Sequence, residues 1–231
     1  MRTWCLSAHD TPARAGFVAK MEDVLAVYAR PVDPARPLIC LDETGKALQD
    51  HLRAPCPMQP GHPARVDPGY QRNGSAALTL WTAPHLGQRG VRVTPQRTRV
   101  EWAETMRLLV EEVFPEAETL VVVLDNLNTH SLAALYHTFP APVARRIAAK
   151  LELHYTPVHA SWLNMAELEL SVLKRQCLNQ RRIPELTTLQ TQVQAWVDDR
   201  NDRQTGIDWH FTTEAARVKL KRLYPTPIFD T

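Results

Sequence analysis

Residues 119–126, which read TLVVVLDN, are the stretch of this 231-residue sequence that decides its fold. An unbroken, β-branched apolar run of this length is typical of a strand that is buried on both faces of a sheet. The run stops at Asp125, and a second short apolar run, residues 38–43 (LICLDE), stops in the same way at Asp42. Both aspartates are therefore expected at the C-terminal ends of buried strands, where open α/β sheets bind their ligands.

The segments around these two strands predict a layered fold. We expect further strands over residues 76–81, 90–93 and 151–155, and helices over residues 15–28, 100–113, 131–138, 142–150, 162–178, 186–200 and 213–223. A proline-rich connector, 30–37, separates the first helix from the rest, and residues 52–75 are expected to form a long loop. The order of elements predicts an α/β fold with a mixed central sheet, flanking helices and a helical C-terminal part. We divide the chain at residue 37, with the N-terminal helix and connector before it and one domain, 38–231, after it.

Composition narrows the class of protein. Hydrophobic residues make up 44% and charged residues 23%, which is typical of a folded globular chain. No apolar run approaches the roughly 18 residues needed to cross a bilayer, so no membrane partner is expected. The four cysteines are scattered without a C-x-x-C pair, which favours a reducing cytoplasm over a disulfide framework or a zinc site. The net charge of +2 is too small to indicate a nucleic-acid partner by itself.

The two aspartates have a structural and a functional interpretation. Each could simply end its strand or cap the next helix. If the strands are neighbours, however, the two carboxylates converge and suit Mg²⁺ or Mn²⁺, which prefer hard oxygen ligands. Glu167 and Glu169 both border the apolar stripe of the helix expected over residues 162–178, and either could supply a third carboxylate. Helical periodicity does not choose between them, and a glutamate in this position is usually solvated.

Several ordered motifs resemble a known family. They are LDE (41–43), RNGSAAL (72–78), VVVLDNLNTH (121–130), HYTPVHASWLNMAELELSVLKR (154–175) and WHFTTEAARVKLKRLYP (209–225). Together, over residues 36–225, they resemble the catalytic core of Tc1/mariner-related transposases, and more narrowly that of the bacterial insertion-sequence-630 family.

The resemblance implies an RNase H-like fold with a DDE metal site. Asp42 and Asp125 match the first two acids of the family. Its L-N-P-x-E signature falls on residues 163–167, with Met165 in place of the proline, and so selects Glu167 as the third acid. These three residues would hold two Mg²⁺ or Mn²⁺ ions and catalyse DNA strand cleavage and strand transfer, in which one metal ion activates the attacking oxygen and the other stabilises the leaving oxygen.

Basic residues are clustered on and just beyond the helix that carries Glu167. Lys174, Arg175, Arg181 and Arg182 are the expected contacts with DNA phosphates, although such a cluster is more often a solvated face. Among the other neighbours, we expect Asn164 to hydrogen-bond near the site and Trp162 to anchor the core. His130 could reach a metal-bound phosphate, but a surface histidine is the favoured interpretation.

Members of this family carry an N-terminal helix-turn-helix region that reads the transposon ends. Only one helix and the connector precede residue 38, so we expect a catalytic half that lacks this region. Its expected partners are DNA, meaning transposon ends and target, together with a second copy or a DNA-binding transposase half. The resemblance places it in a bacterial cytoplasm, at the nucleoid when bound to DNA. Two alternatives stay open: a silent transposase remnant that binds DNA non-specifically or pairs with full-length transposase, and an RNase H-like nuclease that prefers RNA–DNA hybrids.

Overall fold

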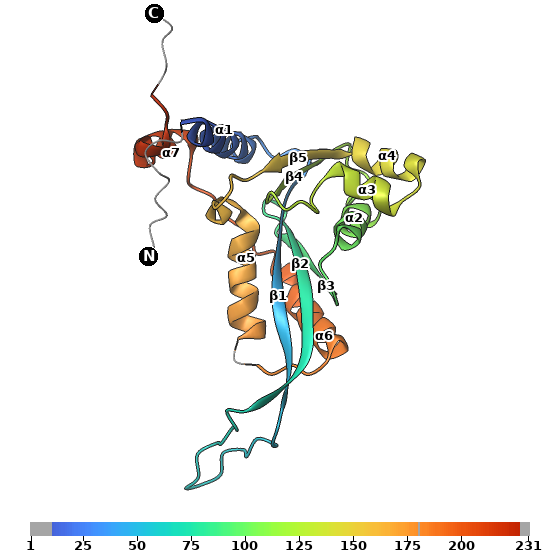
Figure 1. Ribbon diagram of the computed structural model, residues 1–231, viewed down its shortest axis with the longest axis vertical. Coiled ribbons are helices and arrows are strands. Elements are labelled where there is room, and N and C mark those ends of the chain that lie inside the picture. The colour runs from blue at the N-terminus through green and yellow to red at the C-terminus, as the bar shows by residue number, and fades with distance from the viewer. Residues whose placement is uncertain (1–10, 180, 227–231) are drawn as a thin grey trace, which may run out of the picture.

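The chain forms one mixed five-stranded sheet with helices on both faces (Figure 1). The computed structural model describes residues 11–179 and 181–226. The strands are β1 (Leu38–His51), β2 (Tyr70–Ala83), β3 (Gln88–Thr94), β4 (Leu120–Leu124) and β5 (Leu151–Tyr155), in the spatial order β3-β2-β1-β4-β5. The first three strands are antiparallel neighbours, whereas β4 and β5 add in parallel to β1. The predicted α/β architecture is confirmed.

Seven α-helices are described, and they divide between the two faces of the sheet. They are α1 (Thr11–Tyr28), α2 (Arg99–Leu108), α3 (Leu132–Thr138), α4 (Ala141–Ala149), α5 (Met165–Leu173), α6 (Leu186–Asp202) and α7 (Thr213–Lys219). One face is covered by α1, α5 and α6, with α7 packed against α1, and the other face by α2, α3 and α4. None of the helices within the described residues is both long enough and apolar enough to span a membrane.

Side chains alternate between two hydrophobic cores along the central strands. On β1, Cys40 points into the core under α1, α5 and α6, whereas Ile39 and Leu41 point into the core under α2, α3 and α4. On β4, Val123 shares the first core and Val122 the second. This period of two, with apolar residues on both faces, explains why these strands read as continuous apolar runs in the sequence.

The β1–β2 hairpin is longer than predicted. The apolar run predicted a strand that ends at residue 43, but β1 continues to His51, and β2 begins at Tyr70 rather than at residue 76. The end of the hairpin extends away from the helical layers (Figure 1), and residues 70–75 of β2 are exposed and lack the apolar signal of the inner half. On β1, Leu48 lies in the core, but most of residues 45–51 are polar or small and only partly buried. Backbone pairing extends the ladder from Gln49–Arg72 to His51–Tyr70, where Arg182 contacts the side chains of His51 and Tyr70.

The segment predicted as one helix over residues 162–178 has three parts. A 3₁₀ turn, Ser161–Leu163, precedes α5, and a π-helical turn, Lys174–Leu178, follows it. Asn164 separates the first two parts and caps α5, because its side chain accepts a hydrogen bond from the amide of Ala166. Trp162 is 45% exposed and is not the core anchor that we expected; its ring only meets Phe211 edge-on.

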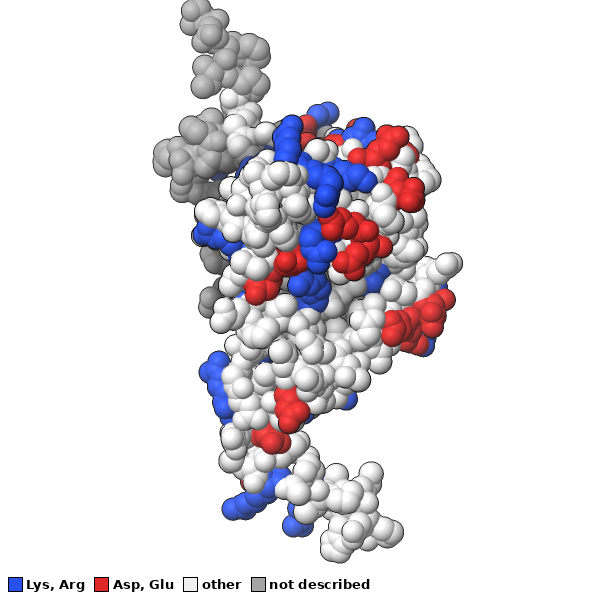
Figure 2. Space-filling view, turned by 90° about the vertical axis from the view of Figure 1, so that its right-hand side faces the viewer, with Lys and Arg blue, Asp and Glu red and all other residues white. Residues whose placement is uncertain are grey.

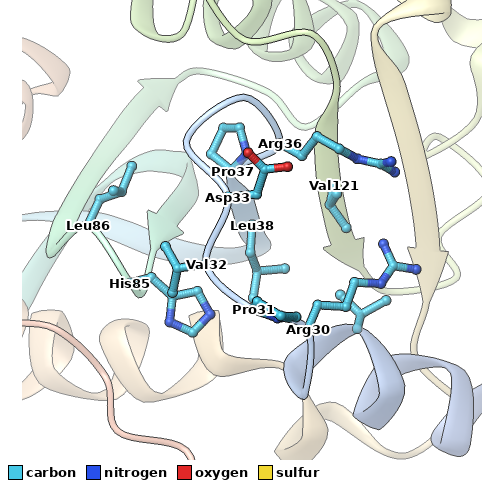
Figure 3. A pocket seen from close by; sticks show the side chains of 11 residues that line it. Arg30, Pro31, Val32, Asp33, Arg36, Pro37, Leu38, His85, Leu86 and Val121 are labelled. Carbon is cyan, nitrogen blue, oxygen red and sulfur yellow. The ribbon is translucent and has the colours of Figure 1, made fainter.

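The cavity shown in Figure 3 lies beside the first residues of β1 and β4. It has a volume of about 480 Å³ and is lined by the connector after α1, the β2–β3 turn and the first residues of the two strands, including Leu38 and Val121. Leu38 precedes Asp42 by four strand positions, which is about 13 Å of extended chain. The cavity is therefore separate from the carboxylates that the sequence singled out.

Candidate active site

Asp42 and Asp125 lie close together on neighbouring parallel strands. Asp125 directly follows β4, as predicted, but Asp42 is the fifth of the 14 residues of β1 and does not lie at its end. The register pairs Cys40 of β1 with Val123 of β4, and each of these residues comes two positions before its aspartate. Because Cys40 belongs to the core under α1, α5 and α6, strand alternation directs the Asp42 carboxylate to that face. Asp125 comes directly after the end of β4, and its negative charge is close enough to raise the pKa of Asp42.

Glu167 joins the two aspartates from the first turn of α5. Asn164 fixes its position, since the Asn164 side chain donates a hydrogen bond of 2.8 Å to the carbonyl of Leu41, the residue before Asp42. The amide of Glu167 in turn donates to the carbonyl of Asn164 at 3.0 Å. Asn164 is 1% exposed and therefore couples the start of α5 rigidly to β1. The expectation that Asn164 hydrogen-bonds near the site is confirmed.

The electrostatics of Asp42 indicate that the three acids are close neighbours. Burial, together with the adjacent Glu167 and the negative charge of Asp125, raises the pKa of Asp42 to about 7. Like charges at close range disfavour ionisation, and so does removal from water. The structure thus brings Asp42, Asp125 and Glu167 together at one edge of the sheet.

Glu169 has a different environment, although it lies only two residues from Glu167. Its carboxylate is 2.8 Å from Arg200 on α6 and 3.2 Å from Arg89 on β3. Glu169 is 2% exposed and is therefore not the solvated residue that is usual for a glutamate at the border of an apolar stripe. The geometry makes Glu169 a structural anion between strand and helix and leaves Glu167 beside the aspartates.

His130 is buried beside Asp125, which corrects the expectation that it lies at the surface. It is 2% exposed, and its ring stacks on the indole of Trp102 with 6.0 Å between the ring centroids. Its Nδ1 is 2.7 Å from an Asp125 carboxylate oxygen, and its Nε2 is 3.5 Å from Glu43. Burial opposes the charged imidazolium, but the two carboxylates raise the pKa of His130 to about 9.

The pKa of Asp125 moves in the opposite direction to that of Asp42. Burial alone would raise it, but the His130 contact and the amide of Leu127 hold the pKa of Asp125 below its usual value. Its side chain remains 37% exposed, so the carboxylate is open to solvent on one side and held by the protein on the other. Asp125 is therefore charged and accessible, as a ligand for a cation must be.

Glu43, Arg97 and Lys20 surround the acids and were not identified from the sequence. Glu43 follows Asp42 but points to the other face of the sheet, where it lies 3.4 Å from Arg97. Lys20 of α1 donates to the side chain of Asn126, the residue after Asp125, at 2.5 Å. The only sequence signal for Glu43 is its place next to Asp42 in a buried strand, and Arg97 and Lys20 have none.

The predicted DNA contacts occupy two kinds of environment. Arg182 is engaged within the protein, because its guanidinium donates to the carbonyls of Asp67, Pro68 and Gly69 and so holds the base of the hairpin loop. Arg181 donates to the carbonyl of Cys177 at 3.3 Å. Lys174 and Arg175, by contrast, form no ion pair with any residue that the structure describes. Figure 2 shows one face of the molecule, on which Lys and Arg lie among Asp and Glu over the upper part instead of forming one basic field.

The donor chemistry of the three acids fits a divalent metal ion. Carboxylate oxygens are the hard ligands that Mg²⁺ and Mn²⁺ prefer. The raised pKa of Asp42 reflects burial first and then the neighbouring acids Glu167 and Asp125, whose repulsion a cation would relieve. Among residues 11–179 and 181–226, no three His, Cys, Asp or Glu side chains are already arranged around one point as metal ligands. The acids are therefore neighbours at one edge without forming a closed coordination shell.

The comparison with known protein families gives the class of this chain. The family model of the DDE superfamily endonucleases matches residues 37–190, and the chain belongs to this family. No curated protein sequence matches the chain.

Among solved structures, the fold is similar to that of Mos1 mariner transposase. The Mos1 paired-end complex with Mn superimposes with a TM-score of 0.59 at 14% identity, covering 97% of this chain and 65% of that one. The Mos1 strand transfer complex gives a TM-score of 0.60 at 13% identity, covering 97% and 64%. The mixed sheet flanked by helices is thus the RNase H-like fold, as predicted. The chain spans about two thirds of the Mos1 chains that it matches.

Proposed function

We propose that this chain is the catalytic domain of a transposase that cleaves and joins DNA strands with the help of divalent metal ions. The observation that carries the proposal is the meeting of Asp42, Asp125 and Glu167 at one edge of the sheet. Family membership supports an endonuclease, and the similar folds belong to Mos1 transposase complexes. The sequence motifs further favour the insertion-sequence-630 branch and hence action on DNA in a bacterial cytoplasm.

Each acid has a distinct part in the proposed site. Asp42 and Asp125 would hold two Mg²⁺ or Mn²⁺ ions from adjacent strands, and Glu167 would complete the set from α5. When bound, the ions would supply an activated attacking oxygen and stabilise the developing charge at phosphorus. The open side of Asp125 is where a scissile phosphate can approach. Asn164 would keep Glu167 in place through its hydrogen bond to Leu41.

DNA and a second protein copy are the proposed partners. The similar Mos1 structures are paired-end and strand transfer complexes, which favours transposon ends and target DNA as substrates and a dimer as the working form. Lys174 and Arg175 are the strongest candidates for phosphate contacts, because both lie on the turn that continues α5 away from Glu167 and neither is neutralised by a described acidic side chain. A separate DNA-binding transposase half could supply the recognition of the ends.

A plasmid assay tests the proposal. Wild-type protein with Mn²⁺ is expected to nick supercoiled DNA and to join a free 3′-hydroxyl end to it, and Asp125→Asn is expected to do neither. Asp208→Asn removes one exposed carboxylate elsewhere and serves as the matched control. Equal activity of wild type and Asp125→Asn would overturn the assignment. A folded wild-type protein that neither nicks DNA nor binds Mn²⁺ would favour the silent remnant.

The RNase H-like nuclease is tested in the same assay. Cleavage of an RNA–DNA hybrid in preference to duplex DNA, with no strand joining, would favour that alternative. No described residue favours it over the transposase, so it serves here as an outcome of the experiment.

A further inference from the structure

The pair formed by Glu43 and His130 lies directly behind the proposed metal ligands. Strand alternation sends Asp42 to one face of β1 and Glu43 to the other, so the two adjacent acids cannot share a site. Glu43 has a side chain that is only 2% exposed. Its carboxylate faces three partners: His130 at 3.5 Å, Arg97 at 3.4 Å and the hydroxyl of Thr79 at 3.3 Å. It is thus a buried anion with compensating neighbours.

His130 is held on every side. The hydroxyl of Tyr155 donates to its backbone carbonyl at 2.9 Å, and its own amide donates to Leu127 at 2.9 Å. Trp102, which is fully buried, stacks on the imidazole and prevents it from turning. The ring nitrogens make no hydrogen bond of regular geometry within the described residues, so the contacts to Asp125 and Glu43 are ionic.

We propose that His130, fixed by Glu43 and Trp102, is a positioning residue that sets the orientation of the Asp125 carboxylate for metal binding. Asp125 follows the last residue of β4 and is followed by a turn, so its backbone alone does not fix its side chain. The 2.7 Å contact from Nδ1 engages one carboxylate oxygen. That contact leaves the other oxygen for the open side of the site. Groups behind a metal ligand commonly orient it in this way, and their loss costs about 10- to 100-fold in metal affinity.

This inference rests on the proposed function, since it assigns Asp125 a metal to bind. A buried histidine could also serve stability alone, as His154 does. His154 is 9% exposed and likewise lies between two carboxylates, Asp23 at 2.7 Å and Glu152 at 2.9 Å, but none of these groups is among the acids at the strand ends. His154 is therefore a matched control for the loss of a buried, ion-paired imidazole.

The test measures Mn²⁺ affinity by electron paramagnetic resonance with the full chain, alongside thermal unfolding. His130→Ala is expected to weaken Mn²⁺ binding by about 10- to 100-fold, whereas His154→Ala leaves it unchanged. His130→Asn places an amide donor near the position of Nδ1 and is expected to restore most of the affinity. Glu43→Gln keeps the volume but removes the charge behind the imidazole and is expected to have a smaller effect of the same sign.

The outcomes separate this inference from the proposed function. If wild type and His130→Ala bind Mn²⁺ equally while Asp125→Asn does not, the positioning role is wrong and the metal site stands. If wild type binds no Mn²⁺, the proposed function fails, and crystal structures then decide the positioning role alone. An Asp125 carboxylate that turns away in His130→Ala supports positioning, and one that stays in place overturns it. If His130→Ala does not fold, the same comparisons are made with His130→Asn and Glu43→Gln.

Discussion

Glu167 and Glu169 are two residues apart on α5, but the charged groups around them have opposite signs. Glu169 is buried between Arg89 and Arg200, so its negative charge is compensated inside the protein. Glu167 faces Asp42, which is also close to Asp125, so three negative groups gather with a common edge open to solvent. Glu169 belongs to an ion network with two arginines, whereas Glu167 belongs to an acidic cluster in which Asp125 is paired with His130.

The difference separates a contribution to stability from a contribution to function. The charge of a buried carboxylate with two guanidinium partners is compensated within the protein. Removing one partner lowers the stability of the fold, because it leaves the other charges buried without compensation. An acidic cluster raises the free energy of the folded state by mutual repulsion, and it persists in a protein when a cation is its partner. The same helix therefore presents Glu169 to the core and Glu167 to the proposed metal site.

The largest effect is expected when an acid of the cluster is neutralised. Asp42→Asn, Asp125→Asn and Glu167→Gln should each reduce Mn²⁺-dependent DNA cleavage by at least about 10³-fold, because a metal ion supplies several kcal/mol at the transition state and about 1.4 kcal/mol corresponds to tenfold in rate. The fold should be kept, and for Asp42→Asn the melting temperature should rise, since burial and two neighbouring acids disfavour its charge.

Glu167→Gln should be compared with Glu169→Gln under identical conditions. A loss of cleavage in the second variant at a temperature where it is folded, with activity retained in the first, would reverse the assignment of the third acid. Cleavage at the wild-type rate in any of the three variants of the acidic cluster would remove that residue from the site.

The second effect is on stability. Glu169→Ala should lower the free energy of unfolding by about 3–5 kcal/mol, because it leaves Arg89 and Arg200 without their shared anion in a buried setting. Urea denaturation measures this change. We expect Mn²⁺ affinity to match that of wild type below the melting temperature. A loss below about 1 kcal/mol, the usual value of an exposed ion pair, would contradict a buried network.

The sequence was sufficient to predict the sheet because apolar runs report burial directly. Residues 119–124 and 151–155 were predicted as strands, and β4 and β5 form there with nearly the same bounds. The outer half of the β1–β2 hairpin was missed, since its solvated side chains give neither an apolar run nor a clear alternation. Its presence depends on backbone pairing, which composition does not encode.

The site was only partly predictable, for a related reason. Asp42 and Asp125 follow apolar runs, so their place directly after buried strand residues could be read from local pattern. Only Asp125 ends its strand as predicted, because β1 continues past Asp42 to His51. The choice of Glu167 over Glu169 needed a family motif, because both border the same apolar stripe and only the distant Arg89 and Arg200 distinguish them. His130 was expected at the surface, because the sequence around it gives no signal that Trp102 stacks on its ring. Long-range contacts decided each of these cases.

A smaller effect is expected at Asn164, which joins α5 to β1. Asn164→Ala removes the helix cap and should cost about 1 kcal/mol of stability. It also removes the bond to the carbonyl of Leu41, so Glu167 loses its fixed relation to Asp42. Cleavage should therefore fall further than the stability loss explains, by about tenfold. Asn164→Ser keeps a capping oxygen but is too short to replace the bond to the carbonyl of Leu41, so it should restore the capping part of the stability without restoring cleavage.

The smallest effect is expected on DNA binding, where Arg175 and Arg182 can be compared in the same way as the two glutamates. Arg182 is compensated by the backbone carbonyls of the hairpin loop, whereas Arg175 has no described ionic partner. If basic side chains without an ionic partner bind DNA, Arg175→Ala should weaken binding to duplex DNA a few-fold. It should also reduce the slope of log affinity against log salt concentration by about 0.9, the value for one phosphate contact. Arg182→Ala should leave that slope unchanged and instead loosen the hairpin loop, which limited proteolysis would detect.

Fluorescence anisotropy at several salt concentrations measures the slope. A change of slope in Arg182→Ala alone would mean that its guanidinium leaves the loop to bind DNA, and the distinction between compensated and open charges would then hold for the acids only.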